Sequence, residues 1–427
     1  MLGSFGSSSH EEEEDPSPPD VQCSHHHHRN FPSPAIQMRQ LLISCAELIS
    51  RSDFSSAHKL ITFLSSNSSP YGDSTERLAH QLTKSLSLRL NRYSTALAGM
   101  SNLPSFLITN NPNIPSSSNN ASSNLSFSSD NETLLQSSYL TLNQITPFVR
   151  FSQLTANQAI LDSIEEGQQS IHIIDFDIMH GVQWPPFMSG IMNRFPLPSL
   201  RITGAGNDLN TLRRTGDRLA KFAHSLGLRF QFHPLLLSDN DDLASAVSSV
   251  IILPDETLAV NCVLNLHKLL KDRERLHLFL QRVKSMNPKV VTLAEIEANH
   301  NHPLFFQRFV EAIDYYAAVF DSLEATLPPN SKERLNVEQV WFGREILDIV
   351  AAEGDSRRER HEKFRSWEMM LRSKGFNVLP LSPFALSQAK LLLRLHYPSE
   401  GYQLHVSSNS LFLGWQNKPL FSISSWR

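Results

Sequence analysis

The chain has 427 residues, of which 40% are hydrophobic and 19% are charged, and its formal net charge is −4. This composition supports a large buried core, and the length indicates two substructures or one domain with a large insertion. The slightly negative charge excludes attraction to DNA or to an anionic membrane by a global basic field. Contact with nucleic acid would need a local patch or a partner.

The three cysteines, Cys23, Cys45 and Cys262, are scattered, which indicates a reducing compartment and no disulfide framework. The segment Met1–Gly6 lacks the basic start and apolar stretch of a secretory signal, and the sequence has no run of 18 apolar residues. Residues 1–34 combine an acidic run, prolines and His25–His28, so they are predicted to form a disordered tail before a domain at 35–427. No metal site is predicted at the histidine run.

The first part of the domain is predicted to be helical. Apolar residues recur at helical spacing in Ile36–Ser50, Asp53 is a candidate cap for the next helix, and Asp73-Ser-Thr-Glu76 resembles a capping box. A Ser/Asn-rich stretch with little periodicity follows at 101–131 and is expected to be a flexible insertion. Two further helices are expected at Thr133–Ile145 and Gln153–Glu165.

From Ser170 onward, apolar runs typical of strands alternate with helical patterns. Strands are predicted at Ile171–Phe176, Leu200–Thr203, Leu228–Phe232, Leu258–Cys262, Val290–Glu295 and Phe376–Pro380, with helices at Leu209–Leu226, Leu266–Met286 and Ser387–Leu395. Long helical patterns at Pro303–Thr326 and Lys332–Glu353 are expected to join the N-terminal helices. Short strands joined by tight turns end the chain at Tyr402–Val406, Leu411–Trp415 and Leu420–Ser424. The pattern predicts an α/β fold: a Rossmann-type, doubly wound, mostly parallel sheet with antiparallel C-terminal strands and an α-helical cap.

The loop after the first strand is where such a fold would bind a nucleotide-type cofactor. It contains Asp175, Asp177 and a single late glycine, Gly181, whereas a cofactor loop needs small residues for close backbone approach. The second strand also runs into Gly204-Ala-Gly-Asn207 without a terminal acidic residue for ribose hydroxyls. The loop is therefore predicted to be degenerate, with no cofactor, and its aspartates are expected to cap loop amides.

Acid–base chemistry has few candidates. His267, His277, His300 and His302 could pair with Glu295 or Glu297, and two of these histidines lie just beyond a strand end. No Ser or Cys lies in a nucleophile-elbow pattern, and Cys262 reads as a buried strand residue. Isolated histidines are more often ordinary polar residues than general bases, so no catalytic residue and no enzyme are predicted.

The helix Leu209–Leu226 has two differing sides. Leu212, Leu219 and Leu226 repeat every seven residues, which fits either a partner-binding coiled-coil seam or, preferably, a helix that packs on the sheet. At 100° per residue, Arg214, Arg218 and Lys221 fall on the opposite side. This basic stripe is either a solvated face or a contact for phosphate or an acidic partner.

Two short motifs have similar ambiguity. Leu266, Leu269 and Leu270 form an LxxLL pattern, by which amphipathic helices dock into coregulator grooves, although burial is the more frequent reason for it. The segment Arg357–Lys363 is a weak candidate for a nuclear-import patch because two glutamates dilute its charge.

Several motifs, in order along nearly the whole chain, resemble those of the plant GRAS family. Residues 171–175 resemble its VHIID signature, and leucine-rich stretches flank them. The matching residues are Ile171, His172, Ile173, Ile174 and Asp175 for VHIID; Pro303, Phe309, Tyr315, Arg344 and Glu345 for PFYRE; and Arg358, Glu359, Trp367, Gly375, Trp415 and Trp426 for SAW. The closing Ser424-Ser-Trp426 replaces the nominal Ser-Ala-Trp. The opening residues and the Ser-Thr-Glu-Arg-Leu stretch resemble the lateral suppressor branch.

The resemblance implies a methyltransferase-like core and a nuclear, non-enzymatic role in transcription and axillary meristem initiation. It implies other transcription factors or coregulators as partners, pairing with itself or related members, and DNA contact directly or through partners, with no membrane. It divides the domain into leucine-rich repeat I (35–100), the insertion (101–131), the VHIID region (132–206), leucine-rich repeat II (208–247), the PFYRE region (257–349) and the SAW region (352–427). The alternative is an S-adenosylmethionine-dependent methyltransferase or a cofactor-binding sensor.

Overall fold

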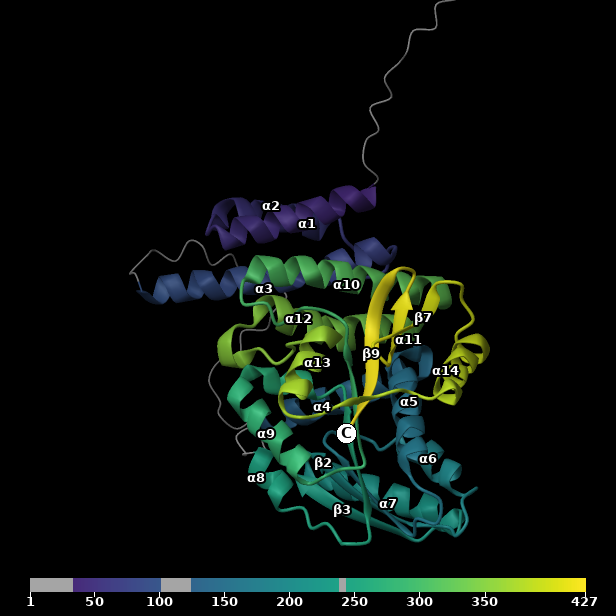
Figure 1. The fold of residues 1–427 in the computed structure, drawn as a ribbon. Helices are drawn as coiled ribbons and strands as arrows, with labels where there is room; N and C mark the ends of the chain where they lie inside the picture. The colour runs from purple at the N-terminus through teal and green to yellow at the C-terminus, as the bar shows by residue number, and fades with distance from the viewer. Residues whose placement is uncertain (1–33, 101–123, 238–242) are drawn as a thin grey trace, which may run out of the picture.

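The computed structural model describes residues 34–100, 124–237 and 243–427. A mixed β-sheet flanked by helices forms one part of the molecule, and a layer of helices covers one end of it (Figure 1). Within the described residues the sheet has the strand order β3-β2-β1-β4-β5-β9-β8-β7, and β6 pairs with β9 off this path. The order β3-β2-β1 followed by β4-β5 is that of a Rossmann-type sheet, so the predicted fold class is confirmed.

The strands lie close to their predicted positions. They are β1 (Ser170–Asp175), β2 (Ser199–Gly206), β3 (Phe230–Leu236), β4 (Thr257–Val263), β5 (Val290–Ile296), β6 (Val378–Leu379), β7 (Tyr402–Ser407), β8 (Ser410–Trp415) and β9 (Lys418–Trp426). The first five pair in parallel, whereas β9 is antiparallel to both β5 and β8. All residues of β5 are buried, as expected of a strand covered on both faces.

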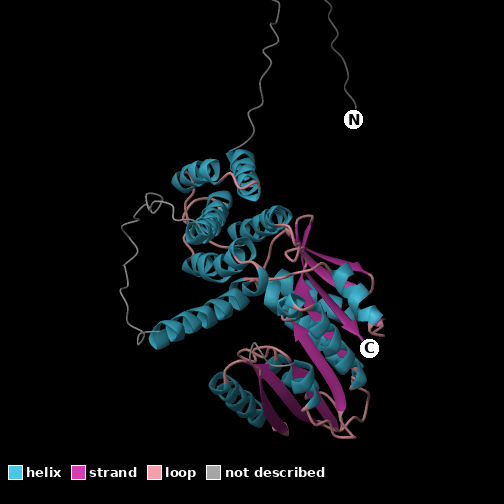
Figure 2. Ribbon diagram, turned by 90° about the vertical axis from the view of Figure 1, so that its left-hand side faces the viewer, coloured by secondary structure: helices cyan, strands magenta, loops and turns pink. Residues whose placement is uncertain are grey.

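Two sets of helices cover the two faces of the sheet (Figure 2). One face packs against α5 (Pro147–Ser163), α6 (Trp184–Ile191) and α7 (Leu209–Ser225). The other packs against α8 (Leu243–Ser248), α9 (Arg273–Ser285) and α13 (Phe364–Ser373). Because neighbouring strand residues point to opposite faces, Ile173 belongs to the first core and Ile174 to the second. A final helix, α14 (Pro383–His396), packs against α5.

The helical cap combines the N-terminal helices with the middle of the chain. It contains α1 (Pro34–Ser50), α2 (Phe54–Ser66), α3 (Ser74–Met100), α4 (Asn124–Ile145), α10 (Phe305–Thr326), α11 (Lys332–Asn336) and α12 (Gly343–Ala351). Helix α3 packs against α10 and α12, so segments more than 200 residues apart in sequence lie side by side. The predicted caps are confirmed: Asp53 accepts from the amide of Ser56 at 3.1 Å, and Asp73 from that of Glu76 at 2.8 Å.

Several expected elements differ from the structure. The predicted strand Phe376–Pro380 is reduced to the two residues of β6, because Phe376 is buried in the core instead of extending a ladder. The predicted helix Leu266–Met286 is divided into a 3-10 turn at Leu266–Lys271 and α9, since Asp272 caps α9 with its side chain. The pattern Lys332–Glu353 is likewise interrupted by a π-helical stretch at Val337–Phe342.

Some predictions lie partly or wholly outside the described residues. The tail at 1–34 is described only at its last residue, and helix α4 begins at Asn124, inside the insertion expected at 101–131. The prediction of flexibility for 101–123 therefore remains a prediction. Among the described residues, no helix has both the length and the apolar character needed to cross a membrane.

Candidate functional site

A cleft of about 1600 Å³ lies between the carboxyl ends of the sheet strands and the helical cap. Its floor comes from residues that follow β1, β2 and β4, and its roof from α4, the π-helical stretch and α12. The polar side chains that line it include Asp175, Asp177, Asp208, His267, Lys268, Glu345, Arg358, Glu359 and His361. This is the place where open α/β sheets bind ligands.

Asp175, at the end of β1, is buried and fixed by neighbours from other elements. Its carboxylate accepts hydrogen bonds from Nε1 of Trp184 at 2.9 Å and from Nδ2 of Asn261 at 3.3 Å, and a long one from the amide of Asp177 at 3.4 Å. Burial raises the pKa of Asp175 to about 7, although these donors oppose the shift. The predicted cap of a loop amide is therefore present only as the long contact with the amide of Asp177. The two shorter hydrogen bonds come from side chains.

Asp177 points in another direction. Its carboxylate accepts a hydrogen bond from Nζ of Lys268 at 2.8 Å, so an ion pair joins the loops after the neighbouring strands β1 and β4 on the floor of the cleft. Neither aspartate keeps the free carboxylate that a cofactor loop would offer.

The residues at this strand end do not fit an S-adenosylmethionine site of the usual construction. Ile178 fills the space beside β2: a Cβ placed on Gly204 would lie 2.7 Å from its Cδ1. No acidic residue ends β2 itself, but Asp208 lies two residues beyond the strand. Its two carboxylate oxygens accept from the amides of Asn210 at 3.2 Å and Thr211 at 2.8 Å, so it caps α7.

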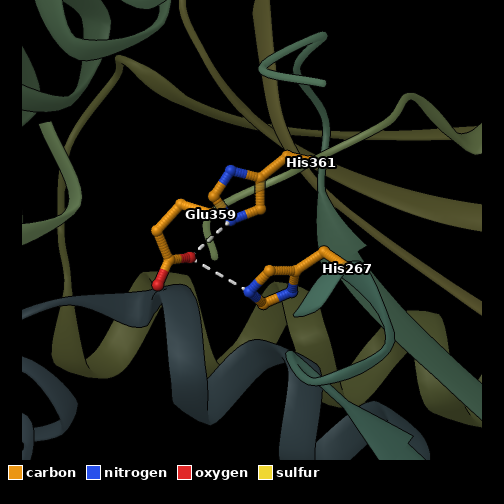
Figure 3. A group of neighbouring side chains, drawn as sticks. All are labelled: His267, Glu359 and His361. Atoms are coloured by element: carbon orange, nitrogen blue, oxygen red, sulfur yellow. Dashed lines mark hydrogen bonds and ion pairs between the residues drawn. The ribbon is translucent and has the colours of Figure 1, made fainter. Parts of the chain in front are cut away.

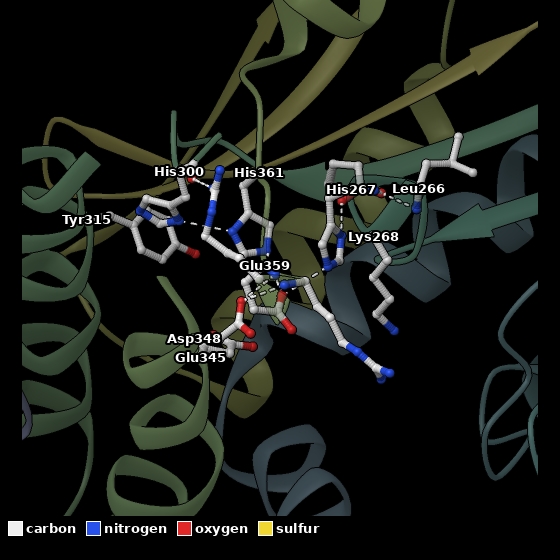
Figure 4. A network of polar contacts seen from close by, with 12 residues as sticks. Leu266, His267, Lys268, His300, Tyr315, Glu345, Asp348, Glu359 and His361 are labelled. Atoms are coloured by element: carbon white, nitrogen blue, oxygen red, sulfur yellow. Dashed lines mark hydrogen bonds and ion pairs between the residues drawn. The ribbon is translucent and has the colours of Figure 1, made fainter. Parts of the chain in front are cut away.

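The most concentrated polar group in the cleft is a cluster of His267, Glu359 and His361 (Figure 3). The Oε2 atom of Glu359 lies 3.0 Å from Nε2 of His267 and 3.3 Å from Nε2 of His361. The other ring nitrogens also have partners: Nδ1 of His267 is 2.7 Å from Oε2 of Glu295, and Nδ1 of His361 is 2.9 Å from Nδ1 of His300. Contacts thus join the five side chains into one largely buried network, of which Figure 4 labels His267, His300, Glu359 and His361.

Opposite forces set the protonation of this network. Burial disfavours charge on His267, but the carboxylates of Glu295 and Glu359 outweigh it and raise the pKa of His267 to about 10. Burial also opposes charge on Glu359, yet hydrogen bonds from the two histidines hold its pKa well below the usual value. Burial and the charge of His267 lower the pKa of His361, and burial lowers that of His300 well below its ordinary value.

Glu345 borders the network from α12. Its carboxylate accepts a hydrogen bond from the hydroxyl of Tyr316 at 3.0 Å, and burial together with nearby Glu359 raises its pKa to about 8. Asp348 fixes the main chain beside Glu359, because its carboxylate accepts hydrogen bonds from the amides of Arg358 at 2.8 Å and Glu359 at 2.7 Å.

The VHIID residues are structural in this fold. Ile171, Ile173 and Ile174 are fully buried, and Nε2 of His172 lies 2.8 Å from Oγ1 of Thr203 on the neighbouring strand. Arg201 and Glu256 form a close ion pair beside the other nitrogen of His172. Of the five residues, only Asp175 reaches the cleft.

The PFYRE and SAW residues fall into two groups. Glu345, Arg358, Glu359 and Arg344 line the cleft. The others hold the fold: Phe309 and Tyr315 are core residues, Gly375 adopts a φ of 81°, and each tryptophan indole has an acceptor. These acceptors are the carbonyl of Glu362 for Trp367, Asp321 for Trp415 and Ser424 for Trp426. Pro303 is exposed at the turn before α10.

The leucines considered as partner contacts have core positions. Leu212 and Leu219 on α7, and Leu266 and Leu270 on the 3-10 turn, are at most 3% exposed, while Leu226 and Leu269 are partly buried against the same cores. This arrangement agrees with the packing alternative preferred for both motifs. Arg214, Arg218 and Lys221 are exposed on the other side of α7, and Arg218 donates to the carbonyl of His180 at 3.0 Å.

His361 is the site residue that the sequence reasoning missed. Of the histidines considered, His267 and His300 join the network, whereas His277 and His302 do not contact it. One available signal was the spacing of Glu359 and His361, because side chains two residues apart in an extended segment point to the same side.

Comparison with known proteins agrees with this geometry. Residues 38–427 match the model of the GRAS domain family. The chain is 51% identical to Scarecrow-like protein 18 of Arabidopsis thaliana over 91% of each chain, and 42% identical to Protein MONOCULM 1 of Oryza sativa subsp. japonica over 91% of this chain and 88% of that one. The crystal structure of SCL7 in Oryza sativa covers 93% of this chain with a TM-score of 0.72 and 32% identity.

The fold and the cleft therefore define a capped, Rossmann-type α/β protein in which the carboxylates near the ends of β1 and β2 are engaged by its own side chains and amides. The chain belongs to the GRAS domain family. Its relatives in that family are regulators of transcription in plant development.

Proposed function

We propose that this protein is a nuclear regulator of transcription that acts through protein partners and promotes the initiation of axillary meristems. The observation that carries the proposal is the likeness to Scarecrow-like protein 18 and Protein MONOCULM 1 over about nine-tenths of each chain. The order of the VHIID, PFYRE and SAW residues supports it, and so does the resemblance of the first residues to the lateral suppressor branch.

The protein acts without catalysis in this proposal. Asp175 is engaged by Trp184 and Asn261, and Asp208 caps α7, so the two positions at which a methyltransferase would hold its cofactor serve the fold instead. Calorimetry with S-adenosylmethionine tests the alternative. Micromolar binding that the substitution Asp175→Asn abolishes would establish a cofactor-binding protein, whereas no heat at millimolar ligand supports a regulator.

Direct contact with DNA, where it occurs, is assigned to the basic stripe of Arg214, Arg218 and Lys221. All three side chains are exposed on one side of α7, and the opposite side of this helix is fixed in the core. Such a stripe would pair with phosphate oxygens, which carry no sequence information, so its contribution would be similar on every DNA sequence.

Replacing the three stripe residues by Ala is expected to weaken DNA binding to a similar extent on every sequence and to reduce the slope of log K against log salt by up to about 3. The control replaces three exposed basic residues elsewhere, Arg365, Lys390 and Arg394, by Ala. Fluorescence anisotropy over a salt series measures the affinity and its salt dependence for each triple variant. Equal losses in the two triple variants would remove the stripe from the proposal.

The biological role needs a test in plants. Chromatin immunoprecipitation of the tagged protein from young leaf axils is expected to recover specific promoters, and plants that lack the protein are expected to form fewer axillary buds. Normal buds in such plants, together with no chromatin enrichment, would contradict the proposed role. Enrichment that disappears when a DNA-binding partner is removed would identify indirect recruitment.

A further inference from the structure

Three ligand-type atoms converge at one point of the cleft wall. His267, Glu359 and His361 each offer one ligand atom, and these atoms lie within 4.8 Å of one another. The side chains come from two segments more than 90 residues apart in sequence. His267 follows β4 on the 3-10 turn, whereas the other two lie in the extended segment between α12 and α13 (Figure 3).

Two of the three separations between these atoms suit a metal ion. Zn²⁺ bonds to imidazole nitrogen and carboxylate oxygen at about 2.0–2.1 Å, so two ligand atoms of a tetrahedral site lie roughly 3.3 Å apart. The carboxylate oxygen of Glu359 lies 3.0 Å from one imidazole nitrogen and 3.3 Å from the other. The ligand atoms of the two histidines lie within 4.8 Å of each other, and an ion bound to all three residues would bring this separation to roughly 3.3 Å as well.

The surroundings also resemble a metal site. Metal-binding histidines usually give their second ring nitrogen to a carboxylate or another acceptor, which fixes the ring orientation. Nδ1 of His267 meets Glu295, whose other oxygen accepts from the amides of Leu266 at 2.8 Å and His267 at 3.2 Å. Nδ1 of His361 meets His300, whose ring stacks on Tyr316. Both rings are therefore held in place with Nε2 directed at Glu359 (Figure 4).

We propose that His267, Glu359 and His361 bind one divalent transition-metal ion, with zinc as the first candidate, and leave one coordination position open to the cleft. Two histidines and one carboxylate form the ligand set of many three-residue zinc sites, in which an exogenous ligand takes the fourth position. All three residues line the cleft, which places that position toward its interior. The ion would also tie the loop after β4 to the segment that joins the cap to α13.

The competing arrangement is a salt-bridged cluster in which a protonated His267 lies between Glu295 and Glu359. In that arrangement a proton lies between Nε2 of His267 and the carboxylate of Glu359, and a metal ion would have to displace it. Added zinc or cobalt therefore binds in the proposed site and does not bind to the salt-bridged cluster. This proposal does not depend on the role in transcription, and its failure would leave that role untouched.

The test uses the full chain with His25–His28 replaced by Ser, because the histidine run would bind metal by itself, and it uses no polyhistidine tag. After treatment with a chelator, zinc binding is measured by competition with a chromophoric indicator. One ion per chain is expected, together with an increase in Tm of about 3 °C or more at zinc concentrations 100-fold above Kd. Cobalt gives a second reading, because four-coordinate Co²⁺ absorbs far more strongly in the visible range than the hydrated ion.

Glu359→Gln and His361→Ala are expected to weaken zinc binding at least 100-fold. Glu295→Gln, which removes the charge beside Nδ1 of His267 and nearly keeps the size of the side chain, is expected to weaken it about 10–100-fold. His277→Ala and His302→Ala are the matched controls and should bind as the parent does. The absence of a cobalt band and of zinc binding in the parent chain overturns the proposal, whether or not the variants fold. Zinc binding that Glu359→Gln and His361→Ala leave unchanged overturns it as well.

Discussion

Asp175 illustrates how one residue of an ancestral site can serve the fold. In a Rossmann-type enzyme the end of β1 faces the cofactor, whereas here the carboxylate is 4% exposed and hydrogen-bonded to Trp184 and Asn261. A buried carboxylate without a cationic partner is costly in its charged form, which explains the raised pKa.

This raised pKa predicts a pH-dependent stability. The folded pKa is about 7 and the ordinary value 3.8, so the folded state holds a proton that the unfolded state has lost between these pH values. Stability therefore falls as the pH rises through this window, by at most about 4 kcal/mol. Asp175→Asn removes the titration, so urea unfolding between about pH 4 and about pH 8 should show a smaller decrease for this variant.

The exposed Asp217→Asn on α7 is the control and should keep the decrease of the parent chain. Parallel curves for the parent and Asp175→Asn would show that the Asp175 carboxylate is already ionised at the lower end of the range.

At the scale of single residues, local sequence predicted the position of Asp175 but not its partners. An aliphatic run that ends in Asp is visible in the sequence, whereas Asn261 lies 86 residues away and meets it only because β4 pairs with β1. The same limit applies to the histidine network. His267 and His300 were noted individually, but His361, which connects them, belongs to a segment without regular secondary structure.

At the scale of elements, a buried ion pair joins the N-terminal helices to the middle of the chain. Arg77 on α3 donates from Nε to Glu338 at 2.8 Å and from Nη1 to Glu324 at 2.9 Å, and the side chains of Arg77 and Glu338 are 3% and 2% exposed. Glu338 lies in the π-helical stretch that interrupts the predicted helix, so the interruption coincides with this contact.

Arg77→Ala is expected to destabilise the protein by up to about 3–5 kcal/mol, because it leaves the carboxylate of Glu338 buried with only Arg334, 3.9 Å away, as a cationic neighbour. Arg51→Ala is the matched control: Arg51 also pairs with a glutamate, Glu47, but its side chain is 74% exposed, so the loss should be below about 1 kcal/mol. The double variant Arg77→Met/Glu338→Leu should recover most of the stability. Chemical unfolding measures all three, and equal losses for the two single variants would show that burial does not govern this pair.

Prediction of the elements succeeded where one periodicity persists and failed where tertiary contacts interrupt it. The strands β1, β4 and β5 are rich in aliphatic residues, and positive φ angles at Ser408 and Asn409 support the hairpin turn expected there. In contrast, the apolar run at Phe376–Pro380 is mostly core filling, and Asp272 divides a continuous helical pattern because its side chain caps α9.

At the scale of the whole molecule, the last strand holds the two parts of the sheet together. β9 lies between β5 of the parallel part and β8 of the terminal hairpin, and it also pairs with β6. Trp426, near its end, is fully buried in the core that contains α9 and α13. The interior of the sheet therefore depends on the final residues of the chain.

Trp426→Ala is expected to cost about 3–5 kcal/mol, as large-to-small substitutions in packed cores do. Val406→Ala is the control: Val406 lies on the edge strand β7 and its side chain is 54% exposed, so the free energy of unfolding should change by less than about 0.5 kcal/mol.

A chain that ends after Asn417 lacks all of β9 and should show no cooperative unfolding transition. Cooperative unfolding of that shortened chain, followed by circular dichroism, would contradict a central role for β9.

The position of β9 also has a consequence during synthesis. Between the end of β5 at Ile296 and the start of β9 at Lys418 the ribosome must add about 120 residues, which takes on the order of 10 s. Throughout that time the nascent β5 has an open edge that no upstream segment of the described chain pairs with in the finished fold. A message with a premature stop codon in its last few codons would therefore yield an aggregation-prone chain, and cellular quality control would remove it before it could compete with the complete protein.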